Sequence, residues 1–260
     1  MSRPSIFITG AAAGIGRATA ELFAARGWFV GLYDVAEGAA EALCQHIGSD
    51  RSVSGKLDSS DAEAFDAALE SFFKAAGGRL DLLFNCAGVV ATGDFAHISL
   101  PRHRRIVEVN LVGVINGCHL GLHYLRQTPG ARVINMASAS AIYGSPAFAS
   151  YSASKFAVRG LTEALNIEWA RYGVRVMDLL PLFVATPMVS NMAYAPVSMD
   201  RLGVRLQAAD VARVVWRAAH WHWWPRVHWY PGWQTLIFAF VQKMSPSWLN
   251  RLTTRLVSGY

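Results

Sequence analysis

The sequence predicts an α/β protein with a parallel, doubly wound β-sheet of about seven strands and a helical extension at the C-terminal end. Short β-branched and aromatic runs alternate with longer helical patterns along most of the chain. Strands and helices that alternate in this way form βαβ units, whose strands are parallel. The 260 residues, 53% of them hydrophobic, can bury one large core. No linker or repeat divides them, so we expect a single domain over residues 1–260.

The predicted elements follow one another after short turns. The strands are residues 5–9, 28–33, 52–57, 80–85, 132–136, 175–180 and 226–230. The first helix runs from a glycine turn to about residue 26, and the others cover residues 36–47, 61–75, 101–125, 151–172 and 208–220. The extension, residues 231–260, begins with an apolar segment. An amphipathic helix over residues 245–257 follows, with Ser245 as its expected cap and Pro246 in its first turn.

A glycine turn joins the first strand to the first helix. Gly10, Gly14 and Gly16 form the pattern G-x-x-x-G-x-G. A strand, a glycine turn and a helix bring the pyrophosphate of a dinucleotide onto backbone N–H groups at the helix N-terminus. On these glycines alone, a purely structural turn of small residues is an equally good interpretation.

Asp34 ends the second predicted strand. An acid at this point accepts hydrogen bonds from the hydroxyls of an adenosine ribose and repels a 2′-phosphate. Val35, Ala36 and Ala13 offer no basic side chain to such a phosphate. These residues favour NAD over NADP, and the competing interpretation of Asp34 is a turn residue at the end of a strand.

Tyr151 and Lys155 are four residues apart on a predicted helix, so their side chains share one face. A nearby cation favours the phenolate, and we therefore expect Lys155 to lower the pKa of Tyr151 toward working pH. A phenol tuned in this way can exchange a proton with a substrate hydroxyl or carbonyl. Ser138 follows a predicted strand and can reach the same substrate oxygen. Taken alone, Y-x-x-x-K also occurs by chance in ordinary helices.

Two motifs with asparagine complete the pattern. Residues 85–88, Asn-Cys-Ala-Gly, end the fourth strand, where ligands of open α/β sheets bind, and Asn110 lies inside a long helix. Together with the glycine turn, the serine and the tyrosine–lysine pair, these motifs resemble the short-chain dehydrogenase/reductase family in order and spacing. The match covers residues 5–187, and it implies a Rossmann-like fold with a nicotinamide cofactor.

The resemblance also implies a role for each site residue. Tyr151 would donate or accept the proton, Ser138 would polarise the substrate oxygen, and Lys155 would bind the nicotinamide ribose. Asn110 would hold a water molecule that links the lysine to solvent. The expected cofactor contacts are Gly10, Gly14, Ile15, Gly16, Asp34, Asp58, Asn85, Ala87, Gly88, Tyr151, Lys155, Pro181, Val184 and Thr186.

The residues that would meet the substrate are mostly apolar. Residues 188–207 correspond to the family's substrate lid and are rich in methionine, which makes such a surface adaptable. We therefore predict an NAD-dependent oxidoreductase that interconverts a secondary alcohol and a ketone on a bulky apolar substrate, such as a steroid, a terpenoid or a lipid-like molecule. The expected substrate contacts are Ser138, Ile142, Tyr143, Phe148, Met188 and Met192.

Two other functions compete with this prediction. A 3-oxoacyl-carrier-protein reductase would use Arg102, Arg104 and Arg105 to meet an acidic carrier. Asp34 argues against that function, because those enzymes generally use NADPH. A non-catalytic, nucleotide-sensing binding protein is the third interpretation, and such a protein would not need the complete set of catalytic residues.

Two features leave alternatives open. Leu182 follows Pro181 where the family usually has glycine, and a left-handed backbone would be costly for leucine there. The apolar stripe of Leu161, Leu165 and Trp169 faces either the chain's own sheet or a partner subunit. The resemblance implies a homodimer or a homotetramer.

The last sixty residues differ from the body in charge. Residues 201–260 carry a net charge of +7 and seven of the nine tryptophans, whereas residues 1–200 carry −1. The positive charge lies among tryptophans and leucines and not in a polar stripe, which argues against nucleic-acid binding. The tail is therefore expected either to pack on a subunit or over the pocket, or to touch a membrane surface through its amphipathic helix.

Cysteine usage indicates the compartment. The three cysteines are odd in number and scattered, which is typical of a reduced, cytoplasmic setting. No apolar run approaches the ~18 residues of a membrane span. His220, His222 and His228 are expected to pack among aromatic side chains and not to bind a metal.

Overall fold

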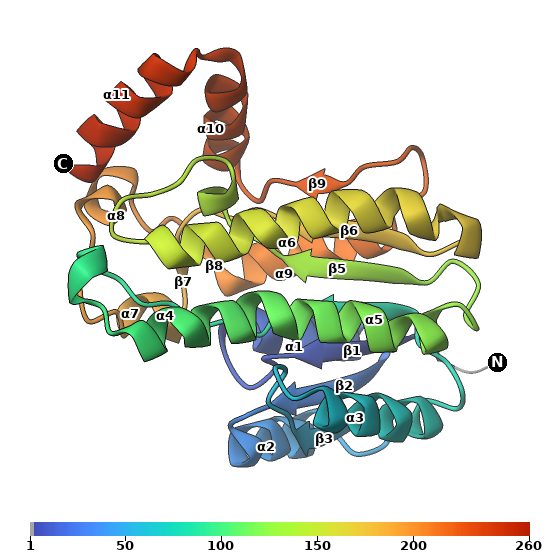
Figure 1. The fold of residues 1–260 in the computed structure, drawn as a ribbon. Coiled ribbons are helices and arrows are strands. Elements are labelled where there is room, and N and C mark those ends of the chain that lie inside the picture. Colours follow the sequence, from blue (N-terminus) through green and yellow to red (C-terminus); the bar gives the residue numbers. More distant parts are fainter. Residues whose placement is uncertain (1–2) are drawn as a thin grey trace.

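Seven parallel strands form the central sheet in the order β3-β2-β1-β4-β5-β6-β9 (Figure 1). The structure is a computed structural model and describes residues 3–260. β1 lies between β2 and β4, so the order of the strands reverses beside it, and the predicted doubly wound topology is confirmed. The strands are β1 (Ser5–Thr9), β2 (Phe29–Asp34), β3 (Ser52–Lys56), β4 (Leu82–Asn85), β5 (Arg132–Met136), β6 (Arg175–Leu179) and β9 (His228–Trp229).

The helices follow the predicted order, and their ends differ from the predicted ones by a few residues. Small shifts are expected at these positions, because the ends of helices fray. The main helices are α1 (Gly14–Ala25), α2 (Glu37–Ile47), α3 (Ala62–Ala75), α4 (Leu100–Val107), α5 (Gly113–Leu125), α6 (Ala149–Glu168), α9 (Ala208–Ala219), α10 (Trp233–Met244) and α11 (Ser247–Ser258). The lid contains α7 (Pro187–Ser190), α8 (Val197–Leu202) and the short strands β7 (Val184–Ala185) and β8 (Leu206–Gln207), which pair with each other.

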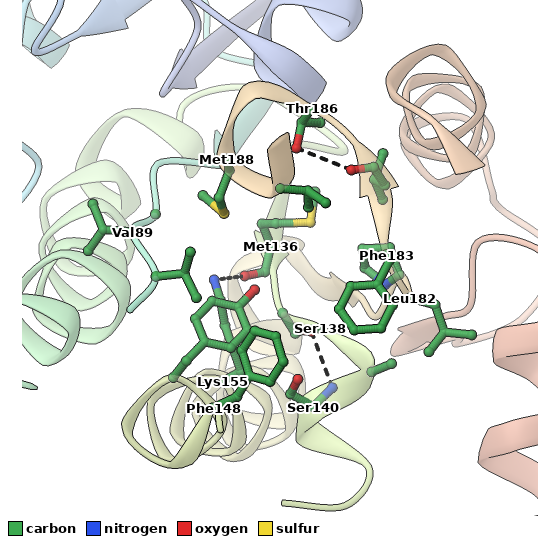
Figure 2. Close-up of a pocket in the computed structure, with 18 of the residues that line it drawn as sticks. Val89, Met136, Ser138, Ser140, Phe148, Lys155, Leu182, Phe183, Thr186 and Met188 are labelled. Atoms are coloured by element: carbon green, nitrogen blue, oxygen red, sulfur yellow. Dashed lines mark hydrogen bonds between the residues drawn. The ribbon is translucent and has the colours of Figure 1, made fainter. Parts of the chain in front are cut away.

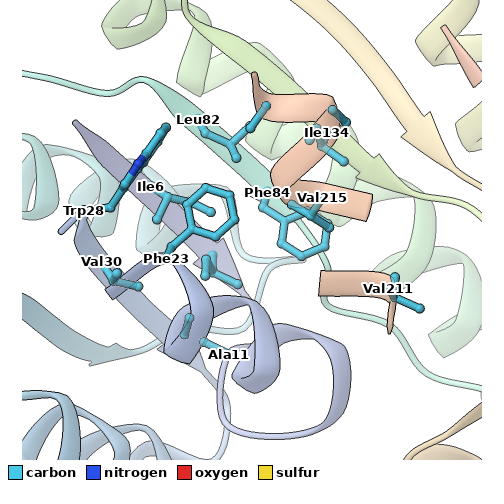
Figure 3. Close-up of a cluster of buried hydrophobic side chains, with 14 of the residues drawn as sticks. Ile6, Ala11, Phe23, Trp28, Val30, Leu82, Phe84, Ile134, Val211 and Val215 are labelled. Atoms are coloured by element: carbon cyan, nitrogen blue, oxygen red, sulfur yellow. The ribbon is translucent and has the colours of Figure 1, made fainter. Parts of the chain in front are cut away.

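Helices cover both faces of the sheet. α1, α2 and α9 pack on one face, and α3, α5 and α6 pack on the other. Figure 3 shows the first of these cores, where Phe23 of α1 and Val215 of α9 lie against Ile6 and Phe84. All four side chains are fully buried, and burying one such side chain stabilises the fold by about 1.5–3 kcal/mol. This packing holds the start of α1, and with it the glycine turn, at the end of β1.

The long predicted helix runs without a break over Leu100–Leu125, as α4, a π-helical turn at Glu108–Val112 and α5. By length and composition it is the one helix among residues 3–260 that could cross a membrane. However, α5 packs on β4 and α3, and α4 packs on α6. Packing inside the fold therefore accounts for its apolar side chains.

The C-terminal extension consists of α10 and α11, which form an open V that stands away from the sheet (Figure 1). The amphipathic helix begins at Ser247, two residues later than predicted, because Ser245 ends α10 with its backbone N–H bonded to the Val241 carbonyl. Pro246 occupies the cap position of α11, and no side chain caps that helix, so the prediction of a Ser245 cap was wrong. α11 contacts α8 of the lid.

The apolar stripe of α6 faces the chain's own core. Trp169 is buried, and Leu161 and Leu165 pack against the cluster on that face of the sheet. The outer side of α6 instead exposes Phe156 and Ile167. The stripe therefore has an intramolecular explanation, and a partner subunit would contact a different set of side chains.

Leu182 does not adopt the left-handed backbone that would be costly for leucine, since Ala147 is the one non-glycine residue of 3–260 with a positive φ. Leucine is tolerated because this loop keeps an ordinary backbone.

The histidines near the end of the chain have different surroundings. His220 stacks on Trp216, whereas the two ring nitrogens of His228 lie 2.8 Å from Asp178 Oδ1 and 3.0 Å from Glu163 Oε1. Two acids therefore accompany His228, although none is near it in the sequence. Residues 3–260 contain no group of three or more such side chains arranged to hold a metal ion.

Candidate active site

A cavity of about 510 Å³ lies where the strands end and collects most of the predicted site residues. It extends from the glycine turn of α1, past the ends of β2, β4 and β5, to the lid and the C-terminal helices. Ligands of open α/β sheets bind at this carboxyl edge, beside the strand at which the order reverses. The cavity is lined by Gly10, Gly14, Ile15, Gly16, Asp34, Asp58, Ala87, Gly88, Ser138, Tyr143, Phe148, Tyr151, Lys155, Pro181, Val184, Thr186, Met188 and Met192, all of them predicted.

Lys155 is held at the floor of this cavity. Its Nζ donates a hydrogen bond of 2.7 Å to the carbonyl of Met136, and only 2% of the side chain is exposed (Figure 2). The same Nζ lies 5.6 Å from the centroid of the Tyr151 ring, as expected for residues four apart on α6. Burial lowers the pKa of Lys155 to about 8, because a low-dielectric environment disfavours the ammonium.

The pKa of Tyr151 moves opposite to the predicted direction. Burial is the largest effect and raises it, whereas a hydrogen bond with Ser138 favours the phenolate and lowers it. The Lys155 cation is therefore not the dominant influence on this phenol. The serine and the tyrosine both line the cavity, where they can address a single substrate oxygen.

Asn110 does not line the cavity, but its side chain forms hydrogen bonds with the backbone beside the cavity. Its Nδ2 donates to the Val89 carbonyl at 2.9 Å, and its Oδ1 accepts from the Val89 N–H at 2.8 Å. It also lies within the π-helical turn, and such turns are frequent at functional sites. Asn110 thus fixes the loop after β4. The predicted water relay stays a prediction.

The glycine turn is required by close packing. Gly10 and Gly14 have φ of +69° and +53°, in the region that favours glycine. A Cβ on Gly16 would collide with the carbonyl oxygen of Gly10 and would lie 2.8 Å from its carbonyl carbon. The third glycine therefore allows α1 to approach β1, as the sequence pattern predicts.

Gly16→Ala is expected to destabilise the protein by about 2–3 kcal/mol, because the rigid backbone of Gly10 cannot move away from the new methyl group. Gly38→Ala on α2 is the matched control, since its Cβ would meet nothing within 4 Å and alanine favours a helix. Thermal unfolding of both variants measures the difference. Equal melting temperatures for the two would contradict this account of the turn.

Asp34 supports the turn from the neighbouring strand. Its Oδ2 accepts a hydrogen bond from the Ala12 N–H at 2.9 Å, and its Oδ1 accepts one from the Ala36 N–H at 3.0 Å. The carboxylate is partly exposed to the cavity, beside Val35 and Ala13. The carboxylate is therefore placed to accept further hydrogen bonds from a ligand. Neither Val35 nor Ala13 carries a positive charge that could pair with a phosphate there.

Two predicted cofactor residues have other partners. Asp58 pairs with Arg105 at 2.6 Å and bonds Ser60, which together hold the pKa of its carboxyl low although burial raises it. Asn85 does not line the cavity, and its Nδ2 instead donates to Asn135 Oδ1 at 2.9 Å. Its position is structural, because it ties β4 to β5 just below the site.

The substrate side is apolar, as predicted, with Phe148 and Met188 facing the space beside Lys155 in Figure 2. Ile142 is an exception, because it packs into the core and does not line the cavity. Sequence reasoning gave packing of the C-terminal extension over the pocket as one alternative but named none of its lining residues, because these side chains reach the cavity only through the fold. The lining residues of the extension are Phe238, Val241, Gln242, Thr253, Thr254, Val257 and Ser258.

Two buried polar atoms on the far side of the cavity lack a partner among the described residues. They are Ser198 Oγ on α8 and Gln242 Oε1 on α10, and both residues are 8% exposed. Burying an unpaired polar group is costly, so these atoms are available to a ligand.

The fold and the site agree with a comparison against protein families. Residues 4–195 match the family model described as short chain dehydrogenase. The chain belongs to the short-chain dehydrogenase/reductase family. This membership accounts for the shared order of the glycine turn, the serine and the tyrosine–lysine pair, and it makes the protein an oxidoreductase of that family.

Relatives of this short-chain dehydrogenase/reductase act on different molecules. This chain is 31% identical over 212 residues to a cyclohexanol dehydrogenase of an Acinetobacter species, and the match covers 80% of this chain and 84% of that one. A short-chain dehydrogenase/reductase from Burkholderia phymatum in complex with NAD has a similar structure, with 28% identity, a TM-score of 0.81 and 92% of each chain covered. A 3-ketoacyl-(acyl-carrier-protein) reductase from Brucella melitensis complexed with NADH is also similar, with 27% identity, a TM-score of 0.78 and coverage of 88% and 97%.

Proposed function

We propose that the protein uses NAD to interconvert a secondary alcohol and the matching ketone of a bulky apolar molecule, such as a steroid, a terpenoid or a lipid-like compound. The observation that carries the proposal is the meeting of Ser138, Tyr151 and Lys155 at one end of a large, mostly apolar cavity. Bulky substrates suit the cavity because apolar surface predominates in its lining.

The residues fit NAD. The glycine turn leaves room for a pyrophosphate at the N-terminus of α1. Gly88 lies beside Lys155, since a Cβ added to Gly88 would be 3.7 Å from Lys155 Nζ. The nicotinamide ribose is expected next to that ammonium group, where glycine leaves the space open. Asp34 would hold the adenosine ribose, and Val184 and Thr186 lie where the nicotinamide amide is expected. When bound, NAD accepts the hydride of the alcohol or NADH returns it to the ketone.

The chain's own residues handle the oxygen and its proton. Ser138 would donate a hydrogen bond to the substrate oxygen, which holds the reacting carbon in place. Tyr151 would take the hydroxyl proton during oxidation and return it during reduction. Lys155 holds its position by its bond to the Met136 carbonyl, so it can bind a ribose without losing orientation.

A 3-oxoacyl-carrier-protein reductase is the second candidate. The Brucella melitensis structure with NADH removes part of the objection from Asp34, because that reductase was solved with the non-phosphorylated cofactor. Against this function, Arg105 is paired with Asp58, which leaves only Arg102 and Arg104 to meet an acidic carrier. The deep apolar cavity therefore favours a free apolar substrate. A non-catalytic binding protein is the weakest candidate, because the complete proton-transfer site would serve no purpose.

A substrate panel tests the proposal. NADH absorbance would be followed with cyclic alcohols, steroids, terpenols, long-chain secondary alcohols and acyl thioesters. Diols and hydroxylated steroids belong in the panel because of the unpaired Ser198 and Gln242 atoms at the far side of the cavity. We expect kcat/KM to rise with apolar size. Preference for acyl thioesters on a carrier protein would support the second candidate instead.

A pH profile follows from the two titrating groups. Burial keeps the pKa of Tyr151 above its ordinary value of about 10, so the phenol that donates a proton to the ketone is present throughout neutral pH. Alcohol oxidation needs the phenolate, so its kcat/KM should increase from pH 6 to about pH 8. Ketone reduction should stay level over this range, and both directions should weaken above about pH 8, where Lys155 loses the charge that would bind the ribose. Initial rates in both directions measure this, and an oxidation rate that declines between pH 6 and pH 8 would contradict it.

We further propose a homodimer or a homotetramer, with a reduced cytoplasmic setting. Exposed apolar side chains lie along the outer sides of α4 to α6, and among them Ile115, Phe156 and Ile167 are suited to an interface. The three cysteines are all free, which fits a reducing compartment.

A further inference from the structure

α10 has its apolar side turned outward. Trp233, Leu236, Ile237, Phe240 and Met244 recur at helical spacing, and each is at least 53% exposed. The buried positions of the same helix are Thr235 and Gln242, which are polar. A helix at a protein surface normally buries its apolar side and exposes its polar side. The reversed arrangement indicates that the outer side of α10 meets something apolar.

α11 adds a second exposed stripe with cations beside it. Trp248, Leu252 and Leu256 are four residues apart, so they form one line, and Trp248 is 66% exposed. Arg251 and Arg255 lie next to this line on the helix and are exposed. We call the eight apolar side chains of these two stripes the outer face of the extension.

The charge around the outer face selects among possible partners. Lys243, Arg251 and Arg255 are exposed on α10 and α11, and no acid follows Asp210 in the sequence. A second copy docked through the same face would bring two sets of cations together without any carboxylate to pair them. An anionic bilayer offers both apolar depth and negative charge, and tryptophan favours its interface.

The two helices are too short to span a bilayer. α10 and α11 each contain 12 residues, whereas a spanning helix needs about 20. Contact would therefore be peripheral, with the helices lying in the interface plane.

The inner side of the same helices lines the active-site cavity. Phe238 and Val241 of α10 and Val257 of α11 contribute to its wall, opposite the lid residues Met192 and Leu202. The extension therefore lies between the catalytic end of the cavity and whatever covers the outer face. A substrate dissolved in the bilayer would reach the cavity without crossing water.

We propose that the outer face of α10 and α11 docks on an anionic lipid bilayer, from which the enzyme takes its substrate. The substrate part rests on the proposed function, whereas the docking does not. The two parts are tested by separate measurements.

Vesicle binding is the test of docking. The full-length protein should co-sediment with phosphatidylglycerol-containing vesicles at low salt, and less with phosphatidylcholine alone or at high salt. Phe240→Asp combined with Trp248→Asp should weaken this binding at least roughly tenfold, because two exposed aromatic side chains that would enter the bilayer become charged. Phe95→Asp is the matched control: Phe95 is also exposed, but it lies outside the extension, so binding should be unchanged.

A second variant tests the charge separately. Replacing Lys243, Arg251 and Arg255 by glutamate should reduce binding to anionic vesicles by roughly a hundredfold and remove its salt dependence. None of the replaced residues lines the cavity, so oxidation of a water-soluble secondary alcohol should stay at the wild-type rate in every variant. That rate reports on the proposed function independently of docking.

Three results would overturn the proposal. Full-length protein that ignores anionic vesicles excludes the bilayer. Binding that is equal on neutral vesicles and insensitive to salt removes the role of the cations. If Phe240→Asp with Trp248→Asp converts an oligomer to a smaller species while vesicle binding persists, the outer face is a subunit interface.

Discussion

Tyr151→Phe is expected to lower turnover by roughly 10²–10⁴-fold while leaving folding and NAD binding intact. The substitution removes only the phenol oxygen, and the ring keeps its packing beside Phe148. Without that oxygen, no group at the Ser138 end of the cavity can take the hydroxyl proton, because the buried Lys155 Nζ is bonded to the Met136 carbonyl. Steady-state rates with the best alcohol of the panel measure the loss. Titration of tryptophan fluorescence with NAD measures binding.

Tyr143→Phe is the matched control for this prediction. Tyr143 also lines the cavity, and its substitution removes the same atom from the same kind of side chain. We expect it to change KM for the substrate while kcat stays within about tenfold, since no proton passes through this phenol. If the Tyr143 variant lost as much turnover as the Tyr151 variant, proton transfer could not be assigned to Tyr151.

The fold was predictable because its signals are local. Short runs of aliphatic, β-branched and aromatic residues predicted the strands of the central sheet, and β1 and β5 begin and end at the predicted residues. The glycine turn was predictable for the same reason, because the approach of Gly16 to Gly10 depends on a few neighbouring residues. Such short-range constraints are written directly into residue spacing.

Contacts between distant segments were not predictable in the same way. Asn85 resembles a ligand-binding residue in the sequence, but its amide bonds Asn135, fifty residues further on. The competing carrier-protein function would have used Arg105 to meet the carrier, but Arg105 pairs with Asp58. In both cases a polar group at the edge of the site bonds a neighbouring element, and spacing along the chain carries no information about that neighbour.

The pKa of Tyr151 shows a related limit. The spacing to Lys155 correctly predicted their proximity, but not the extent of burial around the pair. Burial raises the pKa of the phenol and lowers that of the ammonium, so both groups shift toward their neutral forms. The phenol of the free protein therefore keeps its proton at neutral pH.

The orientation of α10 was also outside the reach of the sequence. The segment is apolar nearly all round, so periodicity could not tell which side would be buried. In the fold, Thr235 bonds the Pro231 carbonyl at 2.7 Å and Gln242 faces inward, which turns the aromatic side outward. Exposure of that side is a property of the assembled chain.

Asp34 should make NAD a better cofactor than NADP by roughly a hundredfold in kcat/KM. A charge-assisted hydrogen bond to the ribose is worth about 1.5–3 kcal/mol, and the same carboxylate repels a 2′-phosphate. Asp34→Ala combined with Val35→Arg is expected to erase or reverse this preference, because Val35 is 57% exposed beside the cavity and an arginine there can pair with the phosphate. The ratio of kcat/KM for the two cofactors is the measurement.

Asp34→Asn separates the charge from the support of the turn. An asparagine oxygen can still accept the hydrogen bond from the Ala12 N–H, so α1 should keep its position, although the Ala36 N–H loses its acceptor and the repulsion of a 2′-phosphate is lost. We therefore expect the asparagine variant to gain activity with NADP and to melt between the wild type and the alanine variant. The alanine variant without arginine should melt lower, because the Ala12 and Ala36 N–H groups lose their acceptor. A wild-type enzyme that prefers NADP would show that the carboxylate at the end of β2 does not contact the ribose.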